Sequence, residues 1–365
     1  MDLEFIKDGG DFLKTKKKPF FPISDPLRDH LQRYDREIDI PVAYSRLKNF
    51  SESVPLYDSD SVDTLWETVI YPVNEWAELS KELTQVYAIL KAAGDLTVMD
   101  HLYTDRVDYC TFGNTHPFRV RIVNSLNDNA DYYYVKRNDA SRVYGLELEH
   151  LLSPKRMYYL TFEETIIEEH VVGIPGDAFI QKWMRSQRLN PVRVAKELIK
   201  FNERCFIRLL GDMRPYNFVV DLTPDFEGTQ IQIRAMDFDQ QSYSGRKNFY
   251  LPQYFKENYP LVEHCLQHLN RTTAYQYQRE ERALIQKRTA LGRARLEDLL
   301  KCMALDSIAS QEKIHSLRSE LAEHHSHNKF LECECMGEIV SESLKLVRTN
   351  KGFTSLGKFN PGSDL

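Results

Sequence analysis

The chain lacks the features that would assign it to a membrane, secreted or nucleic-acid-binding class. No apolar run among its 365 residues approaches the length that spans a bilayer, so we expect no membrane partner. Its first residues, MDLEFIKDGGDF, lack the basic and then apolar order of a secretory signal. The net charge of −6 gives no reason to expect nucleic acid as a partner.

Cysteine is also scarce. Six cysteines in a chain of this length do not form the dense pattern of a disulfide framework, so we expect a cytoplasmic protein in a reducing compartment. The residues that are present, 42% hydrophobic and 28% charged, are typical of a soluble globular protein. The length suits one large two-lobed domain or two to three ordinary ones.

The first hundred residues give few signals. Residues 1–60 are rich in charge and proline and predict an extended arm or a loosely structured cap. A helix is expected from Ser61, because apolar residues recur at three- and four-residue spacing: Val62, Leu65, Trp66, Val69 and Ile70. A second helix is expected at residues 76–91, and Gly94 follows it as a stop signal.

A β-rich stretch begins near Arg106. Three antiparallel strands are expected there, followed by a helix at residues 141–152 and by two more strands. The expected strands are residues 107–112, 118–124, 132–137, 157–162 and 165–171. The segments GNTHP and NSLNDNAD supply the first two turns, and GIPGD then breaks the sheet.

The second half is predicted to be mainly helical. NPVRVAKELIK begins a helix with Asn190 as its cap and a proline in its first position. IQIRAMDFDQQSY contains a strand that ends in two acids. Beyond Tyr254 the chain is expected to be helical again, and the last fifteen residues are expected to fray.

One loop in this half combines an acid, a base and an amide. In GDMRPYNFVVDL, residues 211–222, Pro215 disfavours helical backbone at Arg214, so the segment predicts a tight loop and then a short buried strand. Asp212 and Asn217 lie five positions apart in this loop. A loop that holds such groups together is a candidate for chemistry. On its own, an Asp and an Asn at this spacing are commonly only capping side chains of a turn.

The order of these segments resembles that of the protein-kinase-like fold. GDMRPYNFVVD resembles the kinase catalytic loop, and MDFD at residues 236–239 resembles the metal-binding turn that follows it, with a second acid in place of glycine. EEHVVGIPGD at residues 168–177 is similar to the hinge of the aminoglycoside and choline kinase branch. The resemblance covers roughly residues 105–300 and implies an α+β, two-lobed fold. Its parts would be a partly helical N-terminal extension (1–105), a small antiparallel β-sheet lobe (106–173), a helical lobe (174–350) and a flexible tail (351–365).

The resemblance implies ATP and Mg²⁺ as cofactors and gives roles to single residues. Asp212 would accept or orient the proton of an acceptor hydroxyl, and Arg214 would grip the oxygens of the moving phosphoryl group. Asn217 and Asp237 would supply oxygen ligands of the kind that Mg²⁺ prefers, and Asp239 would add charge beside them. Phosphoryl transfer depends mainly on such positioning and charge.

A lysine and an acid would complete the phosphate contacts. Lys136 would touch the α- and β-phosphates, and an acid of the following helix would hold it in place. Glu147 and Glu149 are the two candidates. Glu147 is preferred because Val143 and Leu151 share its helical face.

Two backbone segments would contact the rest of the nucleotide. Gly113 and Asn114 would let the hairpin backbone approach it, and Glu169 to Val171 would meet the base. No long activation segment follows Asp239, because YLPQYFKENYP comes almost at once. The acceptor is therefore expected to be a small molecule or an atypical protein target. The alternative is a pseudokinase that binds a nucleotide or a partner without phosphotransfer.

A second cluster, HHSHNKFLECEC at residues 324–335, contains the side chains that bind zinc. Its histidines fall in a charged helical stretch, and Cys333 and Cys335 are separated by one residue. A polar helix end is therefore preferred over a metal site.

Overall fold

Two compact units make up the described chain. The computed structural model describes residues 18–58, 61–92, 96–111, 115–186, 188–226 and 228–349. The sheet unit comprises the described residues of Arg28–Asp139 and Met157–His170. The helical unit comprises those of Met1–Leu27, Ala140–Arg156 and Val171–Leu365. The expected α+β class is confirmed, with a large antiparallel sheet in one unit and most of the helices in the other.

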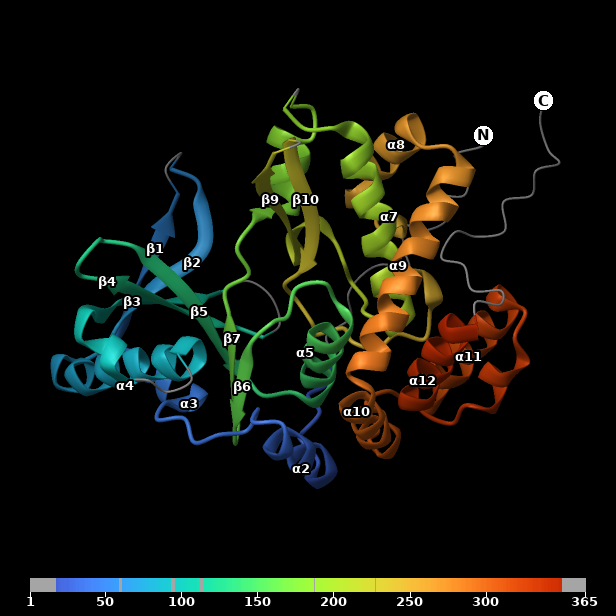
Figure 1. Ribbon diagram of the computed structural model, residues 1–365. Helices are drawn as coiled ribbons and strands as arrows, with labels where there is room; N and C mark the ends of the chain where they lie inside the picture. Colours follow the sequence, from blue (N-terminus) through green and yellow to red (C-terminus); the bar gives the residue numbers. More distant parts are fainter. Residues whose placement is uncertain are drawn as a thin grey trace. The chain divides into compact units, whose positions relative to one another are not determined.

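The sheet unit is built on seven antiparallel strands in the order β1-β2-β3-β4-β5-β7-β6 (Figure 1). The strands are β1 (Glu52–Tyr57), β2 (Asp63–Ile70), β3 (Leu102–Cys110), β4 (Phe118–Asn124), β5 (Ala130–Arg137), β6 (Tyr159–Phe162) and β7 (Thr165–Glu169). Successive side chains of a strand point to opposite faces, so each face of this sheet has its own chemistry.

One face of the sheet packs against α3 (Tyr44–Leu47) and α4 (Val73–Ala92). Figure 1 shows both helices on the same side of the strands. The strand residues that turn toward them are apolar and buried: Val107, Val120, Tyr133, Val135 and Ile167. Full burial of such a side chain stabilises the fold by about 1.5–3 kcal/mol, so this apolar layer holds the two helices to the sheet.

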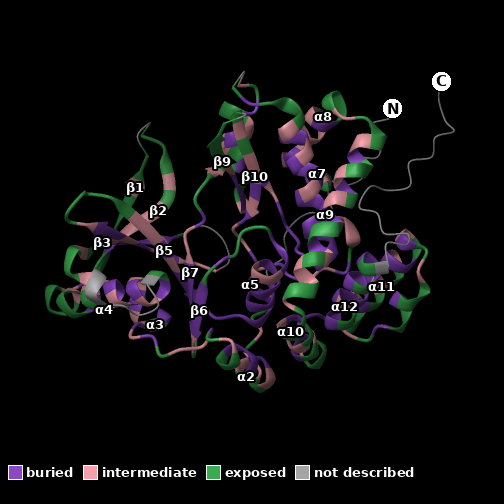
Figure 2. Cartoon of the chain, viewed as in Figure 1, coloured by how far each residue is buried: buried purple, intermediate pink, exposed green. Residues whose placement is uncertain are grey.

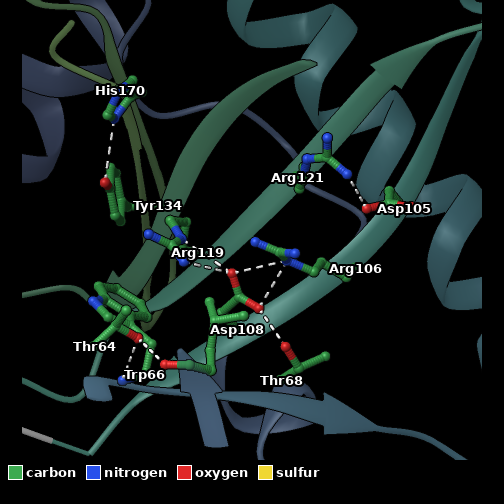
Figure 3. A network of polar contacts seen from close by, with 11 residues as sticks. Thr64, Trp66, Thr68, Asp105, Arg106, Asp108, Arg119, Arg121, Tyr134 and His170 are labelled. Carbon is green, nitrogen blue, oxygen red and sulfur yellow. Dashed lines mark hydrogen bonds and ion pairs between the residues drawn. The ribbon is translucent and has the colours of Figure 1, made fainter. Parts of the chain in front are cut away.

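The opposite face carries charged and aromatic side chains. Asp108 is completely buried and accepts hydrogen bonds from Thr68 Oγ1 (2.9 Å) and Arg119 Nη2 (2.8 Å). Arg106 Nε lies 3.1 Å from Asp108 Oδ1, the same oxygen that accepts from Thr68. The guanidinium of Arg119 also lies 4.5 Å from the ring centre of Trp66. Figure 3 shows these groups converging on one carboxylate from β2, β3 and β4. Two guanidinium groups thus offset the cost of burying this charge.

His170 follows β7 on the polar face. Its Nδ1 shares a hydrogen bond of 3.2 Å with the Tyr134 hydroxyl (Figure 3). Burial lowers the pKa of His170 from its ordinary 6.5; Asp131 opposes this effect, and the charges of Arg119 and Lys91 add to it. Burial also raises the pKa of Tyr134 to about 12, so this hydroxyl remains protonated.

The stability of the protein is expected to fall as the pH drops below about 6.5, in part through His170. Because the folded state disfavours the charged imidazole, the unfolded chain takes up the proton first. The contribution of His170 is fully present above the unfolded pKa and is lost as the pH falls through the lower folded pKa. Urea unfolding at several pH values would measure this slope for the wild type and for His170→Gln.

His268→Gln is the matched control, because His268 lies exposed near the end of α8 (Tyr259–His268). This control should keep the wild-type slope, whereas His170→Gln should flatten it. An NMR titration of His170 with a midpoint at or above 6.5 would contradict the prediction.

The structure corrects two expectations for the first hundred residues. The helix expected from Ser61 is the strand β2, whose β-branched and aromatic side chains suit a sheet and whose backbone pairs with β1 and β3. The expected loose arm contains α2 (Asp25–Arg33), α3 and β1, and Leu47 of that stretch lies in the core of the sheet unit. The sheet therefore starts with β1, well before residue 106.

Several other elements are confirmed. α4 covers the helix expected at residues 76–91, and β4 has the bounds that the sequence predicts. β6 and β7 are shorter than expected and end the sheet at Glu169. Gly94, the expected stop signal, lies outside the described residues.

The helical unit combines a small sheet with packed helices. The sheet has the order β10-β9-β8, formed by β8 (Ile174–Pro175), β9 (Phe218–Asp225) and β10 (Gly228–Ala235). The helices, besides α8, are α5 (Ala140–Leu152), α6 (Gly176–Ala178), α7 (Pro191–Arg208), α9 (Arg271–Leu291), α10 (Arg293–Leu305), α11 (Gln311–His325) and α12 (Met336–Thr349). Figure 1 shows α7 and α9 side by side, and these two helices pack on each other. None of the described helices is both long enough and apolar enough to cross a membrane.

Helix α7 begins as the sequence predicts and carries buried charge. Asn190 caps it by accepting a hydrogen bond from Val192 N at 3.0 Å. Arg204 lies 2.6 Å from Glu197 on the same helix and 3.5 Å from Glu281 of α9, and its side chain is only 4% exposed. Burial raises the pKa of Glu197, and Arg204 opposes that effect. These pairs link α7 to α9, because a buried carboxylate without a cation is strongly destabilising.

Candidate active site

The predicted catalytic loop and the acidic turn are neighbours in the helical unit. Helix α7 ends at Arg208, and the capping residue Leu209, with a φ of 57°, turns the chain out of the helix. Gly211 N then donates to Gln240 O at 3.2 Å, and Met236 N donates to Asn217 O at 3.0 Å. The loop is therefore tied at both ends to the segment that carries Asp237 and Asp239.

Glycine at position 211 permits a close approach. A Cβ atom there would lie 2.5 Å from Cδ1 and 2.7 Å from Cε1 of Phe249. The next residue, Asp212, donates its backbone N–H to Phe249 O at 3.2 Å. The glycine that precedes the acid is thus explained by the packing of the loop directly on Phe249.

Asp212 is held by its backbone and by an arginine. Its φ of 58° is left-handed, a conformation that Asp and Asn tolerate better than most residues. Arg214 Nε donates to its carboxylate at 2.9 Å, and Arg214 Nη1 donates to Glu257 at 2.6 Å. Burial opposes the charged form of Arg214, but the hydrogen bond and the charge of Asp212, together with Tyr216 and Glu257, raise its pKa. The loop therefore presents a carboxylate with a fixed positive charge beside it.

Asn217 faces the same loop. Its Nδ2 donates to the backbone oxygen of Asp212 at 2.7 Å, and its own N–H donates to Arg214 O at 2.9 Å. Because the amide nitrogen is pinned to the loop, the amide oxygen is directed away from it. Asn217 ends a short 3-10 turn and is followed directly by β9. The start of β9 is buried, as expected for the strand after Pro215.

Asp237 and Asp239 follow β10 and share a cation from α5. Arg142 Nη2 lies 2.6 Å from Oδ1 of each carboxylate, and Arg142 Nε donates to Asp239 at 2.7 Å. Ser141, beside it, donates to Gln241 O at 2.8 Å. The first turn of α5 is thus fastened to the acidic turn.

The donor atoms at this turn suit Mg²⁺. Asp237, Asp239 and Asn217 offer carboxylate and amide oxygens, the hard ligands that this ion takes. The guanidinium of Arg142 reduces the net charge of the two carboxylates from −2 to −1. Among the described residues, no group of three or more His, Cys, Asp and Glu side chains is arranged to hold a metal ion. A cation here would therefore depend on two carboxylates and on Asn217.

Lys136 pairs with a different acid from the expected one. Its Nζ lies 2.7 Å from Glu168 on the neighbouring strand β7, and both side chains are buried in the sheet unit. Glu147 is bound instead by Arg295 of α10 through bonds of 2.6 and 2.8 Å, and Glu149 pairs with Arg208 of α7. This corrects the expected pairing, because both acids of α5 already have cations from the helical unit.

These pairs explain how α5 can be buried along nearly its full length (Figure 2). Its three ionic side chains, Arg142, Glu147 and Glu149, are paired with the acidic turn, α10 and α7 in that order. Buried charges that are paired in this way avoid the large cost of isolated ones. The two acids of α5 therefore each have a cationic partner inside the helical unit.

Four further positions were predicted to contact the nucleotide or to lie beside its base. Gly113 and Asn114 lie outside the described residues. Glu169 ends β7, where its N–H donates to Tyr158 O at 3.1 Å and its carboxylate accepts from Tyr158 N at 2.9 Å. Val171 is buried in the helical unit. The backbone N–H of Glu169 is thus already used inside the sheet.

The cluster at residues 324–335 lies at the end of α11 and in the turn beyond it. His327 Nε2 shares a hydrogen bond of 2.8 Å with Glu342 of α12. His325 is buried between the rings of Phe206 and Phe330, at 5.6 Å from each. Cys333 is buried too, and burial raises its pKa to about 12. These contacts tie α11 to its neighbours.

The sequence did not single out Arg142 or Glu257. Arg142 stands in the first turn of a helix otherwise notable for its acids, and Glu257 lies 43 residues beyond Arg214. One signal was available for Arg142. An arginine among the apolar residues of a buried helix requires an acidic partner, and MDFD offered two.

No protein-family model matches this chain, and no curated protein matches it significantly. The functional argument therefore depends on the residues and on their arrangement.

Proposed function

We propose that the protein is a kinase-like phosphotransferase that moves the γ-phosphoryl group of ATP to a hydroxyl of a small molecule or an atypical protein target. The backbone coupling between the loop and the acidic turn carries this proposal. It fixes Asp212 and Asn217 beside Asp237 and Asp239. The resemblance of GDMRPYNFVVD and MDFD to kinase segments supports the same function. The two-lobed kinase-like arrangement, with the sheet unit as the small lobe, belongs to the proposal.

In this reaction Asp212 takes the proton of the acceptor hydroxyl. The acceptor oxygen then forms a bond to the γ-phosphorus, and the bond from that phosphorus to the β,γ-bridging oxygen breaks, so that ADP leaves. Arg214 offsets negative charge on the moving group, which is the main task of a protein in this chemistry. Asn217 and Asp237 would hold Mg²⁺, which when bound supplies further positive charge at the phosphate oxygens. Lys136, held by Glu168, would bind the other phosphates.

A second candidate function is a pseudokinase that binds a nucleotide or a partner without transfer. One observation favours it: Arg142 already bridges Asp237 and Asp239. An arginine in that place supplies the positive charge that the two carboxylates need without any metal. The two functions differ in whether the acidic turn still takes up a divalent cation.

Phosphate labelling separates the two functions. The protein would be incubated with γ-labelled ATP and Mg²⁺, with a panel of hydroxyl metabolites and with cell lysate. Label on an acceptor supports the phosphotransferase. Stabilisation by ATP in thermal unfolding, without label transfer or hydrolysis, supports the pseudokinase, because a ligand that binds only the folded state raises its apparent stability. A lack of both stabilisation and transfer would overturn the phosphotransferase and the nucleotide-binding form of the pseudokinase.

Asp237→Asn is expected to weaken Mg²⁺-dependent nucleotide binding by about tenfold or more, since even outer-shell partners of a metal ligand affect metal affinity about 10- to 100-fold. Asp239→Asn should have a much smaller effect. The Asp237 side chain is 29% exposed and that of Asp239 15%, and Arg142 holds Asp239 through two nitrogens. Calorimetric titration with ATP, with and without Mg²⁺, measures both variants. Equal effects would show that the turn is structural.

A further inference from the structure

The two carboxylates proposed to hold a divalent cation already share a cation from the protein. Arg142 Nη2 lies 2.6 Å from Asp237 Oδ1 and 2.6 Å from Asp239 Oδ1. Its Nε also donates to Asp239 Oδ1 at 2.7 Å. The arginine side chain is only 1% exposed, so it belongs to the interior of the helical unit. Its guanidinium occupies the space on the shared side of both oxygens.

Hydrogen bonds at the start of α5 fix the position of this guanidinium. Ser141 Oγ donates to Gln241 O at 2.8 Å and lies 3.4 Å from Asp239 O. The N–H of Ala140 donates to Phe21 O at 2.9 Å. The two residues directly before Arg142 are therefore anchored, and the arginine cannot leave both carboxylates without a local change in α5 or in the turn.

A divalent cation and the guanidinium need the same oxygen atoms. Mg²⁺ binds oxygen at about 2.0–2.1 Å, so an ion held by these Oδ1 atoms would lie only a few ångströms from the Arg142 nitrogens. Like charges at that distance repel strongly when water is excluded. Asp237 is the more exposed carboxylate and Asp239 the one bonded by two nitrogens, so Asp237 is the one that can turn from arginine to metal.

We infer that Arg142 is a positioning residue that competes with the divalent cation for Asp237 and Asp239, and so sets the metal affinity of the acidic turn. Arg142 holds the two carboxylates together while no metal is bound. Metal binding then breaks its bond to Asp237 and keeps its bond to Asp239 through Nε. The inference rests on the proposed function in one respect, namely that this turn takes up a divalent cation.

Direct cation binding without nucleotide tests this inference. Mn²⁺ serves as the probe, because it prefers the same oxygen ligands and its binding is read by electron paramagnetic resonance. Arg142→Met should bind Mn²⁺ at least about tenfold more tightly than the wild type, because a nearby like charge is removed. Arg142→Lys should lie between the two, since an ammonium keeps the charge but not the forked reach. Asp237→Asn in the Arg142→Met background should abolish the gain.

Arg295→Met is the matched control. It removes an arginine whose side chain is 17% exposed from buried Glu147 on the same helix as Arg142, away from the acidic turn, and should leave Mn²⁺ affinity unchanged. Thermal unfolding and circular dichroism check that each variant folds. If Arg142→Met does not fold, the wild type still decides the question. The NMR signal of the Arg142 Nη groups should shift on saturation with Mg²⁺, whereas the Nε–H signal should keep its chemical shift because the bond from Nε to Asp239 remains.

Two results would overturn the inference. One is equal Mn²⁺ affinity in the wild type and in Arg142→Lys and Arg142→Met. The other is an Arg142 spectrum that Mg²⁺ leaves unchanged. Arg142→Met could bind Mn²⁺ more tightly while the wild type transfers no label from ATP. That result would support the inference about Arg142 and would count only against the proposed phosphotransferase.

Discussion

Asp212→Asn is expected to lower phosphoryl transfer from ATP by about a hundred- to ten-thousand-fold, which is the usual contribution of a positioned general base. The affinity for ATP should stay nearly unchanged. Asparagine tolerates the left-handed backbone at this position as aspartate does. The backbone bonds of residue 212 to Phe249, Arg214 and Asn217 do not involve the carboxylate that is lost.

The measurement is turnover of γ-labelled ATP beside an ATP titration of the same protein. Asp225→Asn is the control, because Asp225 lies exposed at the end of β9, where its carboxylate accepts hydrogen bonds from Phe226 N and Gln230 Nε2. This control should turn over at the wild-type rate. Label transfer that persists unchanged in Asp212→Asn would remove this residue from the mechanism.

Arg204→Met is expected to destabilise the protein by about 3–5 kcal/mol, the usual cost of removing one partner from a buried ion pair. The substitution leaves Glu197 and Glu281 facing each other in the interior, since Arg204 pairs with both. Glu281 keeps Arg288 at 3.1 Å, so Glu197 bears most of the loss. Urea unfolding, followed by far-UV circular dichroism, measures the change.

Two further variants identify the cause of that loss. Arg293→Met removes a surface arginine, 72% exposed, from its pair with Glu297 and should cost far less stability than Arg204→Met. Adding Glu197→Gln to Arg204→Met should restore part of the stability, because the stranded charge is gone. Burial already raises the pKa of Glu197, so the deficit of Arg204→Met should also shrink as the pH falls and this carboxyl takes up a proton. A deficit that is independent of pH and of Glu197→Gln would indicate lost packing instead.

Much of the fold could be predicted from local patterns. The cap and proline that begin α7, the apolar face of α4 and the alternation in β4 are each read from a few neighbouring residues. The prediction of a helix from Ser61 was wrong because it too used only neighbouring residues. Its apolar residues fit a helical spacing, but β2 is decided by strands on both sides, including β3 some forty residues away.

The candidate site was predictable in part. The loop with Asp212 and Asn217 and the turn with Asp237 could be found because each is a compact segment. Their contact, through Gly211–Gln240 and Asn217–Met236, depends on how β9 and β10 pair. Partners were harder to predict than positions. Glu147 was matched to Lys136 because the resemblance pairs a strand lysine with an acid of the following helix, whereas the structure pairs Glu147 with Arg295, far along the chain.

The ion pair of Glu147 with Arg295 joins residues 148 positions apart. It therefore constrains which substitutions can accumulate as related sequences diverge. A single replacement at either position strands a buried charge, whereas a joint replacement by two apolar residues or by a swapped pair does not. Positions 147 and 295 should therefore change together among related chains, as should 149 and 208. Such correlated substitutions would mark a distant relative of this protein even where few individual residues remain identical.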